Sequence, residues 1–405
     1  MTTTKIDKPH LKSVILEGYR SIQHVETDFA SGLNIIIGVN GAGKTNFLSF
    51  LEEALEMEYY EKLNFRAEFK LIKEKSSLSI IANSTSDINK DDSFVSVNSI
   101  KYSITDDKGK KEETTDSTVV KTKIFGGNFY YSSEFIKHSL PLHFPLFTEY
   151  FRFSVDFKKG GVSDELFATL FNKDAPYFIQ SALASTFFEL QRNSKNLEDF
   201  FETEVELFQK SLFESFIKHT NSILNIFTPI TEIRLSDKIK IWKDVELNKM
   251  NVENLAFEFK VGKNWLPFSQ LSDGTKRLFY IISNVSATDD YYFTSFGFGV
   301  TVEPIERIIL IEEPELGIHP HQLRKLMDFL KEQSQDKQII ITTHSPQVLD
   351  VLGSEELDRI ILCEYDNEKG TQLRRMTVEE KESAGKFMQK MYLSDFWRYT
   401  DFNDK

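Results

Sequence analysis

The sequence predicts an α/β protein built on a mixed sheet with flanking helices, into which an antiparallel β arm and a compact helical lobe are inserted. Three observations predict this class. An apolar strand at 33–37 runs into a glycine-rich loop and an amphipathic helix. Two further apolar strands, 307–311 and 338–342, flank a helical pattern near the other end of the chain. In the section between these two ends, apolar and polar residues first alternate as in strands, and apolar residues then recur at helical spacing.

The same patterns divide the chain into four segments. Residues 1–62 and 263–405 have mixed α/β character, and we expect them to close on each other as one head. Along residues 63–155, apolar and polar residues alternate, as they do in the strands of an antiparallel arm. Residues 156–262 are predicted to form the helical lobe, because apolar residues recur three or four apart from about 163 to 227.

Two local features of the middle section can be predicted. Within the arm, the polar stretch 83–93 is interpreted as a loop. Residues 95–105 and 118–124 are expected to pair as a hairpin around the charged tip 106–110. The chain contains 36 Phe, concentrated in its middle, and we interpret them as a Phe-packed interior.

Composition is that of an ordinary soluble globular protein, with 40% hydrophobic and 27% charged residues. The formal net charge of -13 disfavours a nucleic-acid coat over the whole surface, although a local basic groove stays compatible with it. Cys363 is the only cysteine, which excludes an intrachain disulfide and a cysteine-based zinc site. No apolar run approaches the roughly 20 residues that cross a bilayer, so we expect a cytoplasmic protein without membrane contact.

The loop from Gly38 to Thr45 has the spacing of a phosphate-binding loop between a strand and a helix. Its glycines let successive backbone N–H groups point at a phosphate, Lys44 supplies a mobile positive charge, and the Thr45 hydroxyl can ligate Mg²⁺. The following helix aims the positive end of its dipole at the same anion. We therefore expect a nucleoside triphosphate to bind at Asn40, Gly41, Gly43, Lys44, Thr45 and Asn46.

Carboxylates that hold a metal and activate water are expected at the carboxyl end of a buried strand. The apolar strand 307–311 ends in Glu312 and Glu313. We predict that Glu312 reaches Mg²⁺, directly or through its water shell, and that Glu313 is the general base. A second buried strand, 339–343, ends in His344, which we predict to sense the γ-phosphate.

The segment from Leu271 to Arg277 opens a helix with a serine and a glycine. The exposed N–H groups of a helix start and the Ser272 hydroxyl form a second anion site, with Gly274 beside it. Taken with the phosphate loop and the acidic strand, this segment resembles the signature motif of ATP-binding-cassette (ABC) ATPases. The resemblance implies an ABC-type P-loop ATPase head, ATP as the nucleotide, and a head-to-tail dimer in which Ser272 of each subunit completes the other's phosphate site.

Three segments, 15–21, 312–320 and 392–397, more closely resemble the soluble branch related to RecF, SMC and Rad50. Within that branch the chain resembles the small stand-alone ATPases of AAA15 and AAA21 type found in anti-phage systems such as Septu, retron and PARIS. It departs from the common pattern in two places. Glu312 stands where aspartate is usual, and Asp273 stands where the transporter signature has glycine.

The resemblance implies an ATPase that uses ATP and Mg²⁺ to switch a homodimer or larger homo-oligomer and to control a separate effector, a nuclease or toxin, in anti-phage defence. Lys44 and Ser272 would neutralise the charge that develops on the γ-phosphate. Two alternatives stay open: a RecF- or Rad50-like DNA-repair ATPase that binds DNA, and an ATP-binding scaffold with little turnover that holds a toxin or nuclease. Gln180 is a candidate for the glutamine that links the γ-phosphate to the inserted lobe in this family.

Overall fold

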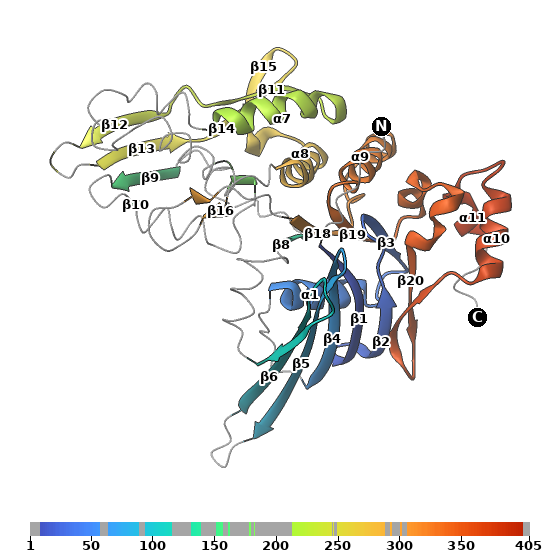
Figure 1. Cartoon of the computed structure of the whole chain (residues 1–405). Coiled ribbons are helices and arrows are strands. Elements are labelled where there is room, and N and C mark those ends of the chain that lie inside the picture. The colour runs from blue at the N-terminus through green and yellow to red at the C-terminus, as the bar shows by residue number, and fades with distance from the viewer. Residues whose placement is uncertain are drawn as a thin grey trace. The chain divides into compact units, whose positions relative to one another are not determined.

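The computed structural model divides into two compact units (Figure 1). The head unit comprises Met1–His138, Glu306–Leu316 and Leu323–Lys405, and the second unit comprises Ser139–Ile305 and Gly317–Gln322. Both ends of the chain therefore belong to the head unit. The boundaries of the four segments drawn from the sequence stay predictions. The structure describes residues 9–56, 64–88, 94–115, 131–138, 151–156, 161–162, 178–179, 182, 213–244, 246, 249–287, 292–293, 300–301 and 306–399.

The head unit is built on one mixed sheet with the strand order β7-β6-β5-β4-β1-β2-β21-β20-β3-β19-β18-β8. The predicted α/β class with a mixed sheet and flanking helices is confirmed. Its strands are β1 His10–Tyr19, β2 Ile22–Asp28, β3 Leu33–Ile37, β4 Phe65–Lys73, β5 Ser76–Ile88, β6 Phe94–Thr105, β7 Lys111–Thr114, β8 Tyr131–Ile136, β18 Glu306–Glu312, β19 Gln338–Thr343, β20 Ile360–Asp366 and β21 Gly370–Arg375.

The described helices of the head unit are α1 Lys44–Glu56, α9 Pro320–Gln333, α10 Val378–Phe387 and α11 Leu393–Tyr399, with short 3₁₀ turns η3 Pro346–Val351 and η4 Ser354–Arg359. The first residues of α9, up to Gln322, belong to the second unit. Helix α1 packs its apolar face on the sheet, where Phe47, Phe50 and Leu51 join the core formed with residues of β1, β4 and β5. Tyr19 of β1 meets Phe50 edge to face, with ring centroids 5.3 Å apart.

Strands β20, β3, β19, β18 and β8 pair in parallel, in that order. β3 and β19 are buried along their whole length, which accounts for their unbroken apolar sequences, because a parallel sheet is covered on both faces. The register places Thr343 opposite Ile37 and Glu312 opposite Thr342. The carboxyl ends of β3, β19 and β18 therefore lie together at one edge of the sheet.

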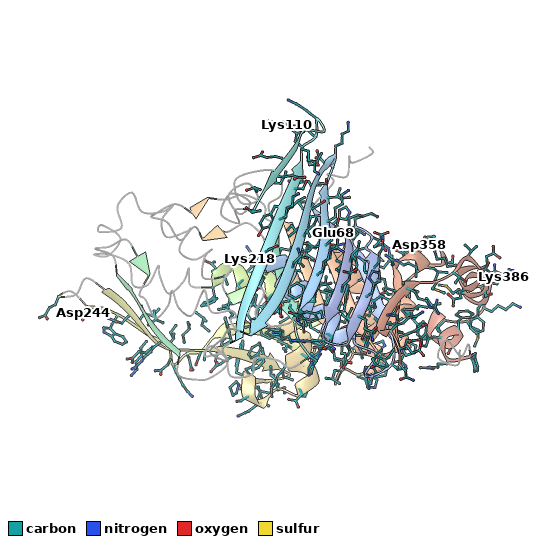
Figure 2. All side chains as sticks on the ribbon, turned by 90° about the horizontal axis from the view of Figure 1, so that it is seen from below. Glu68, Lys110, Lys218, Asp244, Asp358 and Lys386 are labelled. Atoms are coloured by element: carbon teal, nitrogen blue, oxygen red, sulfur yellow. The ribbon has the colours of Figure 1, made fainter. Side chains whose placement is uncertain are left out.

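The β arm, strands β4 to β7, continues the sheet of the head unit through the antiparallel pairing of β4 with β1. The hairpin tip at 106–110 is confirmed, and Lys110 marks this tip in Figure 2. The strand after the tip is β7, which pairs with β6; the predicted partner, 118–124, lies outside the described residues. The expectation of a loop from residue 83 is corrected, because β5 runs on to Ile88 in register with β6.

The second unit combines helices with three small antiparallel sheets, ordered β10-β9-β13-β12, β11-β14-β15 and β16-β17. Helix α7 lies in the predicted helical lobe, 156–262, but strands β11 to β14 lie in the same range, so the described part of this segment combines helix and strand. The described elements are α7 Glu214–Phe227, α8 Asp273–Ser286, η2 Phe268–Gln270, β9 Phe151–Asp156, β10 Gly161–Val162, β11 Ile230–Leu235, β12 Lys240–Asp244, β13 Lys249–Leu255, β14 Phe257–Val261, β15 Asn264–Pro267, β16 Tyr292–Phe293 and β17 Val300–Thr301.

Phenylalanine rings form the described core of the second unit, as the composition predicts. Phe259 of β14 meets Phe279 of α8 edge to face at 5.0 Å between centroids. Phe213 meets Phe257 in the same way at 5.2 Å, and Phe178 stacks on Phe216 at 5.1 Å. These rings bury large apolar areas, so they join α7 and α8 to the β11-β14-β15 sheet.

A matched pair of glycine substitutions tests the packing of the head sheet. Gly370 and Gly109 both have a left-handed backbone, with φ of +70° and +80°. A Cβ on Gly370 would lie 2.2 Å from the backbone oxygen of Ser21, whereas a Cβ on Gly109 meets nothing within 4 Å. We expect Gly109→Ala to lower the free energy of unfolding by about 1 to 2 kcal/mol. Gly370→Ala should lower it by about 3 kcal/mol or more. Equal losses in urea titrations would contradict this packing.

Candidate functional site

The predicted phosphate-binding loop connects β3 to α1 and packs closely on the β20–β21 hairpin. Gly41 and Gly43 have φ of +84° and +101°, which residues with a side chain rarely adopt. Gly38 is needed for a different reason, because a Cβ there would lie 2.0 Å from the backbone oxygen of Cys363. A Cβ on Gly43 would also lie 1.9 Å from Thr371 Oγ1. The glycines thus satisfy both the loop conformation and its contact with the neighbouring strands.

Lys44 is held inside its own loop. Its side chain is largely buried, and Nζ donates to the backbone oxygens of Gly38 and Val39 at 2.8 and 2.9 Å. Burial lowers the pKa of Lys44, and the nearby carboxylates, Glu313 among them, act in the opposite direction. The ammonium group is therefore already positioned at the loop, where phosphate oxygens can replace the two carbonyl acceptors.

Glu312 joins the two halves of the predicted metal site. Thr45 Oγ1 donates to Glu312 Oε1 at 2.5 Å, and the backbone N–H of His138 donates to Oε2 at 3.2 Å. The ring Nδ1 of His138 lies 2.6 Å from the same Oε2. Burial raises the pKa of Glu312, but the hydrogen bonds from Thr45 and His138 outweigh it, so the pKa lies below its usual value. The group is therefore held as a carboxylate.

Thr45 and Glu312 offer the hard oxygen donors that Mg²⁺ prefers, a hydroxyl and a carboxylate. Two oxygens that share an octahedral Mg²⁺ at about 2.1 Å each lie about 3 Å apart. The observed separation of 2.5 Å is a little shorter, so a small movement lets both oxygens reach one ion. The glutamate at 312, where aspartate is usual, still reaches the loop hydroxyl. The donor set fits the predicted ion.

His138 was not identified from the sequence. It follows β8, which pairs in parallel with β18, so its position lies at the same sheet edge as Glu312. The signal was weak, because a short strand with a polar residue after it occurs many times in the chain. The predicted linking residue Gln180 lies outside the described residues. His138 is thus the additional side chain that the structure brings to the predicted metal ligands.

Glu313 and His344 lie side by side at the ends of β18 and β19. The carboxylate Oε1 of Glu313 lies 3.2 Å from His344 Nδ1. The backbone N–H of Glu313 donates to the backbone oxygen of Thr342 at 2.8 Å. Glu313 has φ of +46°, a left-handed conformation that costs roughly 1 to 3 kcal/mol and is concentrated at active sites. The structure brings the two residues together, and their catalytic roles stay predictions.

Asn46 connects α1 to the turn between β1 and β2. Its Nδ2 donates to Ser21 Oγ at 2.7 Å, and its Oδ1 accepts from Arg20 at 3.5 Å. Ser21 Oγ in turn lies 2.8 Å from Thr371 Oγ1. Asn40, by contrast, is exposed at the loop. The predicted nucleotide contacts of both asparagines stay predictions.

Ser272 and Gly274 belong to the second unit. Ser272 is the N-cap of α8, because its Oγ accepts from the backbone N–H of Thr275 at 3.3 Å. A Cβ on Gly274 would lie 2.4 Å from the backbone oxygen of Gly317, so close packing also requires this glycine. The contact of Ser272 and Gly274 with a nucleotide stays a prediction. The close approach of the Gly317 backbone is by itself sufficient reason for a glycine at position 274.

A glycine-rich loop, paired carboxylates and a histidine lie at the carboxyl ends of β3, β18 and β19, which is the arrangement expected of an ATPase head. The family model AAA_21, described as "AAA domain, putative AbiEii toxin, Type IV TA system", matches residues 232–350. That range contains Ser272, Glu312, Glu313 and His344.

Curated relatives match short parts of the chain. Septu protein PtuA of Bacillus thuringiensis is 37% identical over 90 residues, which are 22% of each chain. DNA replication and repair protein RecF of an Exiguobacterium species is 49% identical over 39 residues, 10% of each chain. The chain thus spans about a fifth or less of these relatives. These matches confirm, over short segments, the predicted resemblance to RecF and to a protein of the Septu system.

Among solved structures, the SMC head bound to the C-terminal winged-helix domain of ScpA is similar over 92% of this chain and 99% of that chain. The TM-score is 0.49 and the identity is 14%. Within the described part of this chain, no helix is both long enough and apolar enough to span a membrane.

Cys363, beneath the phosphate loop, provides a chemical test of this geometry. Burial raises the pKa of its thiol to about 12, although Lys44 acts in the opposite direction. Because the thiolate is the nucleophile, we expect the folded chain at pH 8 to react with a maleimide far more slowly than the chain unfolded in urea. A mass-spectrometric time course measures both rates. Equal rates would contradict the buried placement of Cys363.

Proposed function

We propose that this chain binds ATP with Mg²⁺ in the head unit and hydrolyses it within a pair of head-to-tail subunits. We further propose that this cycle controls a separate effector protein in anti-phage defence. The observation that carries the proposal is the convergence of Thr45, Glu312, Glu313 and His344 at one sheet edge, through the contacts of Thr45 with Glu312 and of Glu313 with His344. The match to a Septu protein supports the defence role.

Phosphate binding, proton transfer and metal binding are each assigned to groups of the head unit. Backbone N–H groups of the loop and Lys44 bind the phosphates, and Lys44 exchanges its two carbonyl acceptors for phosphate oxygens. Glu313 accepts the proton of the attacking water, and His344 contacts the γ-phosphate. Thr45 and Glu312 would hold Mg²⁺, which supplies neutralisation of phosphate charge when bound.

The second subunit enters through Ser272. Its hydroxyl and the first N–H groups of α8 form an anion site at the N-terminus of a 14-residue helix. In the proposed dimer this site meets the γ-phosphate on the other subunit's loop. Closure would then depend on ATP, and hydrolysis would reopen the pair and change the contact with the effector.

The variant Glu313→Gln tests the proposed general base. It should lower the rate of ATP hydrolysis by about 100-fold or more, because a positioned base contributes about that factor. ATP affinity should stay within about threefold, and ATP should then hold the variant as a closed dimer. Phosphate release, a binding titration and light scattering measure these three properties. Glu332→Gln, an exposed glutamate on α9, is the control. Unchanged hydrolysis by Glu313→Gln would refute the assignment.

Mixing two inactive variants tests whether the sites are composite. Lys44→Ala should lose ATP affinity, and Ser272→Ala should retain binding but lose hydrolysis. A mixed dimer contains one site with both intact residues, so each mixed dimer should have up to about half the activity of a normal dimer. Lys75→Ala, an exposed lysine, is the control for the loop variant. If the mixture stays as inactive as its components, each site is completed within one subunit.

The match to RecF supports DNA binding as a second candidate function. A DNA-dependent ATPase would hydrolyse ATP faster with duplex DNA, and this stimulation would fall steeply with salt because phosphate contacts release counterions. The net charge of -13 argues against a broad DNA surface. Hydrolysis assays with duplex at two salt concentrations distinguish the two functions.

A further inference from the structure

Glu315 is a buried carboxylate that the proposed hydrolysis does not use. Its side chain is 8% exposed. Its Oε1 accepts hydrogen bonds from Thr343 Oγ1 at 2.5 Å, from the backbone N–H of His344 at 3.2 Å and from that of Ser345 at 3.3 Å. Its Oε2 is buried without a hydrogen-bond partner in the described part of the chain. One oxygen thus receives three donors from the turn that carries His344.

These contacts hold the turn where β19 ends. Thr343 is the last residue of β19, and beyond it the backbone N–H groups lose the ladder partners of the sheet. Glu315 accepts from the next two of these N–H groups. Ser345 N–H also donates to Thr343 Oγ1 at 2.9 Å, so the hydroxyl and the carboxylate form one small network. Without Glu315, the turn would lack the acceptor that fixes it.

Glu313 and Glu315 both lie close to Nδ1 of the His344 ring. Nδ1 of His344 lies 3.2 Å from Glu313 Oε1 and 3.4 Å from Glu315 Oε1. Carboxylate oxygens are acceptors, so Nδ1 carries the hydrogen. A phosphate oxygen is also an acceptor, so a contact between it and Nε2 would require a hydrogen on that nitrogen as well. Glu313, at 24% side-chain exposure, is more accessible to water than Glu315.

We propose that Glu315 is a positioning residue for hydrolysis. It holds the turn 343–345 against the turn that follows β18, and it thereby fixes His344 beside Glu313. The proposal rests on the proposed function, because it assigns Glu315 an effect that acts through His344. Glu313 moves the proton, and Glu315 keeps the geometry in which His344 meets the phosphate.

A double-mutant cycle tests this role. Glu315→Ala should lower kcat by about 10- to 100-fold, as misplacement of a catalytic group does, with KM for ATP changed less than threefold. In a His344→Ala background the same substitution should have no further effect on kcat. Glu315→Gln should retain most activity, because its amide oxygen still accepts the three hydrogen bonds. Glu332→Ala is the control at an exposed glutamate.

Thr343→Val gives a second route if Glu315→Ala does not fold. It keeps the side-chain shape and removes the hydroxyl that donates to Glu315 and accepts from the Ser345 N–H. It should lower kcat, again without further loss in the His344→Ala background. Additive losses in the cycle, or unchanged kcat for Glu315→Ala and Thr343→Val, would overturn the positioning role. If the unsubstituted protein itself does not bind and hydrolyse ATP, the proposed function fails, and this result is distinct from a failure of the positioning role.

Discussion

The parallel register of β3, β19 and β18 determines where the functional side chains of the head unit lie. Thr343 pairs with Ile37, and Glu312 pairs with Thr342. The phosphate loop, His344 and the two glutamates therefore leave the sheet at nearly the same level. Side chains alternate along a strand, so a slip of one residue in β18 would turn Glu312 away from Thr45.

Around this edge, carboxylates connect elements that are distant in the sequence. Glu312 links α1, through Thr45, to the end of β8, through His138. Glu313 and Glu315 link the end of β18 to the end of β19. Each carboxylate contacts donors of an element other than its own, so the loss of one donor leaves an acceptor in the site without that hydrogen bond. The polar contacts thus make the geometry of the site depend on the whole edge.

The sequence was most informative where a buried strand ends in a polar motif. The loop 38–45, Glu312–Glu313 and His344 could be placed because long apolar runs and glycines specify strand and turn together. Strands β11, β12, β13 and β14 fall within 156–262, the range assigned to the helical lobe, because the helical spacing seen from about 163 to 227 was extended over the whole segment. Residues 83–88 form a strand through pairing with β6, although their polar sequence indicated a loop. His138 gave no motif, since only the fold brings it to Glu312.

The proposed activity requires that Thr45 and Glu312 form one half of an ATP–Mg²⁺ site that Glu313 and His344 complete. A crystal structure of the Glu313→Gln variant with ATP and Mg²⁺ would show whether they do. We expect the 2.5 Å hydrogen bond between Thr45 and Glu312 to open, with both oxygens at the ion and with His344 beside the γ-phosphate. An ion bound elsewhere, with the hydrogen bond between Thr45 and Glu312 still in place, would refute this site.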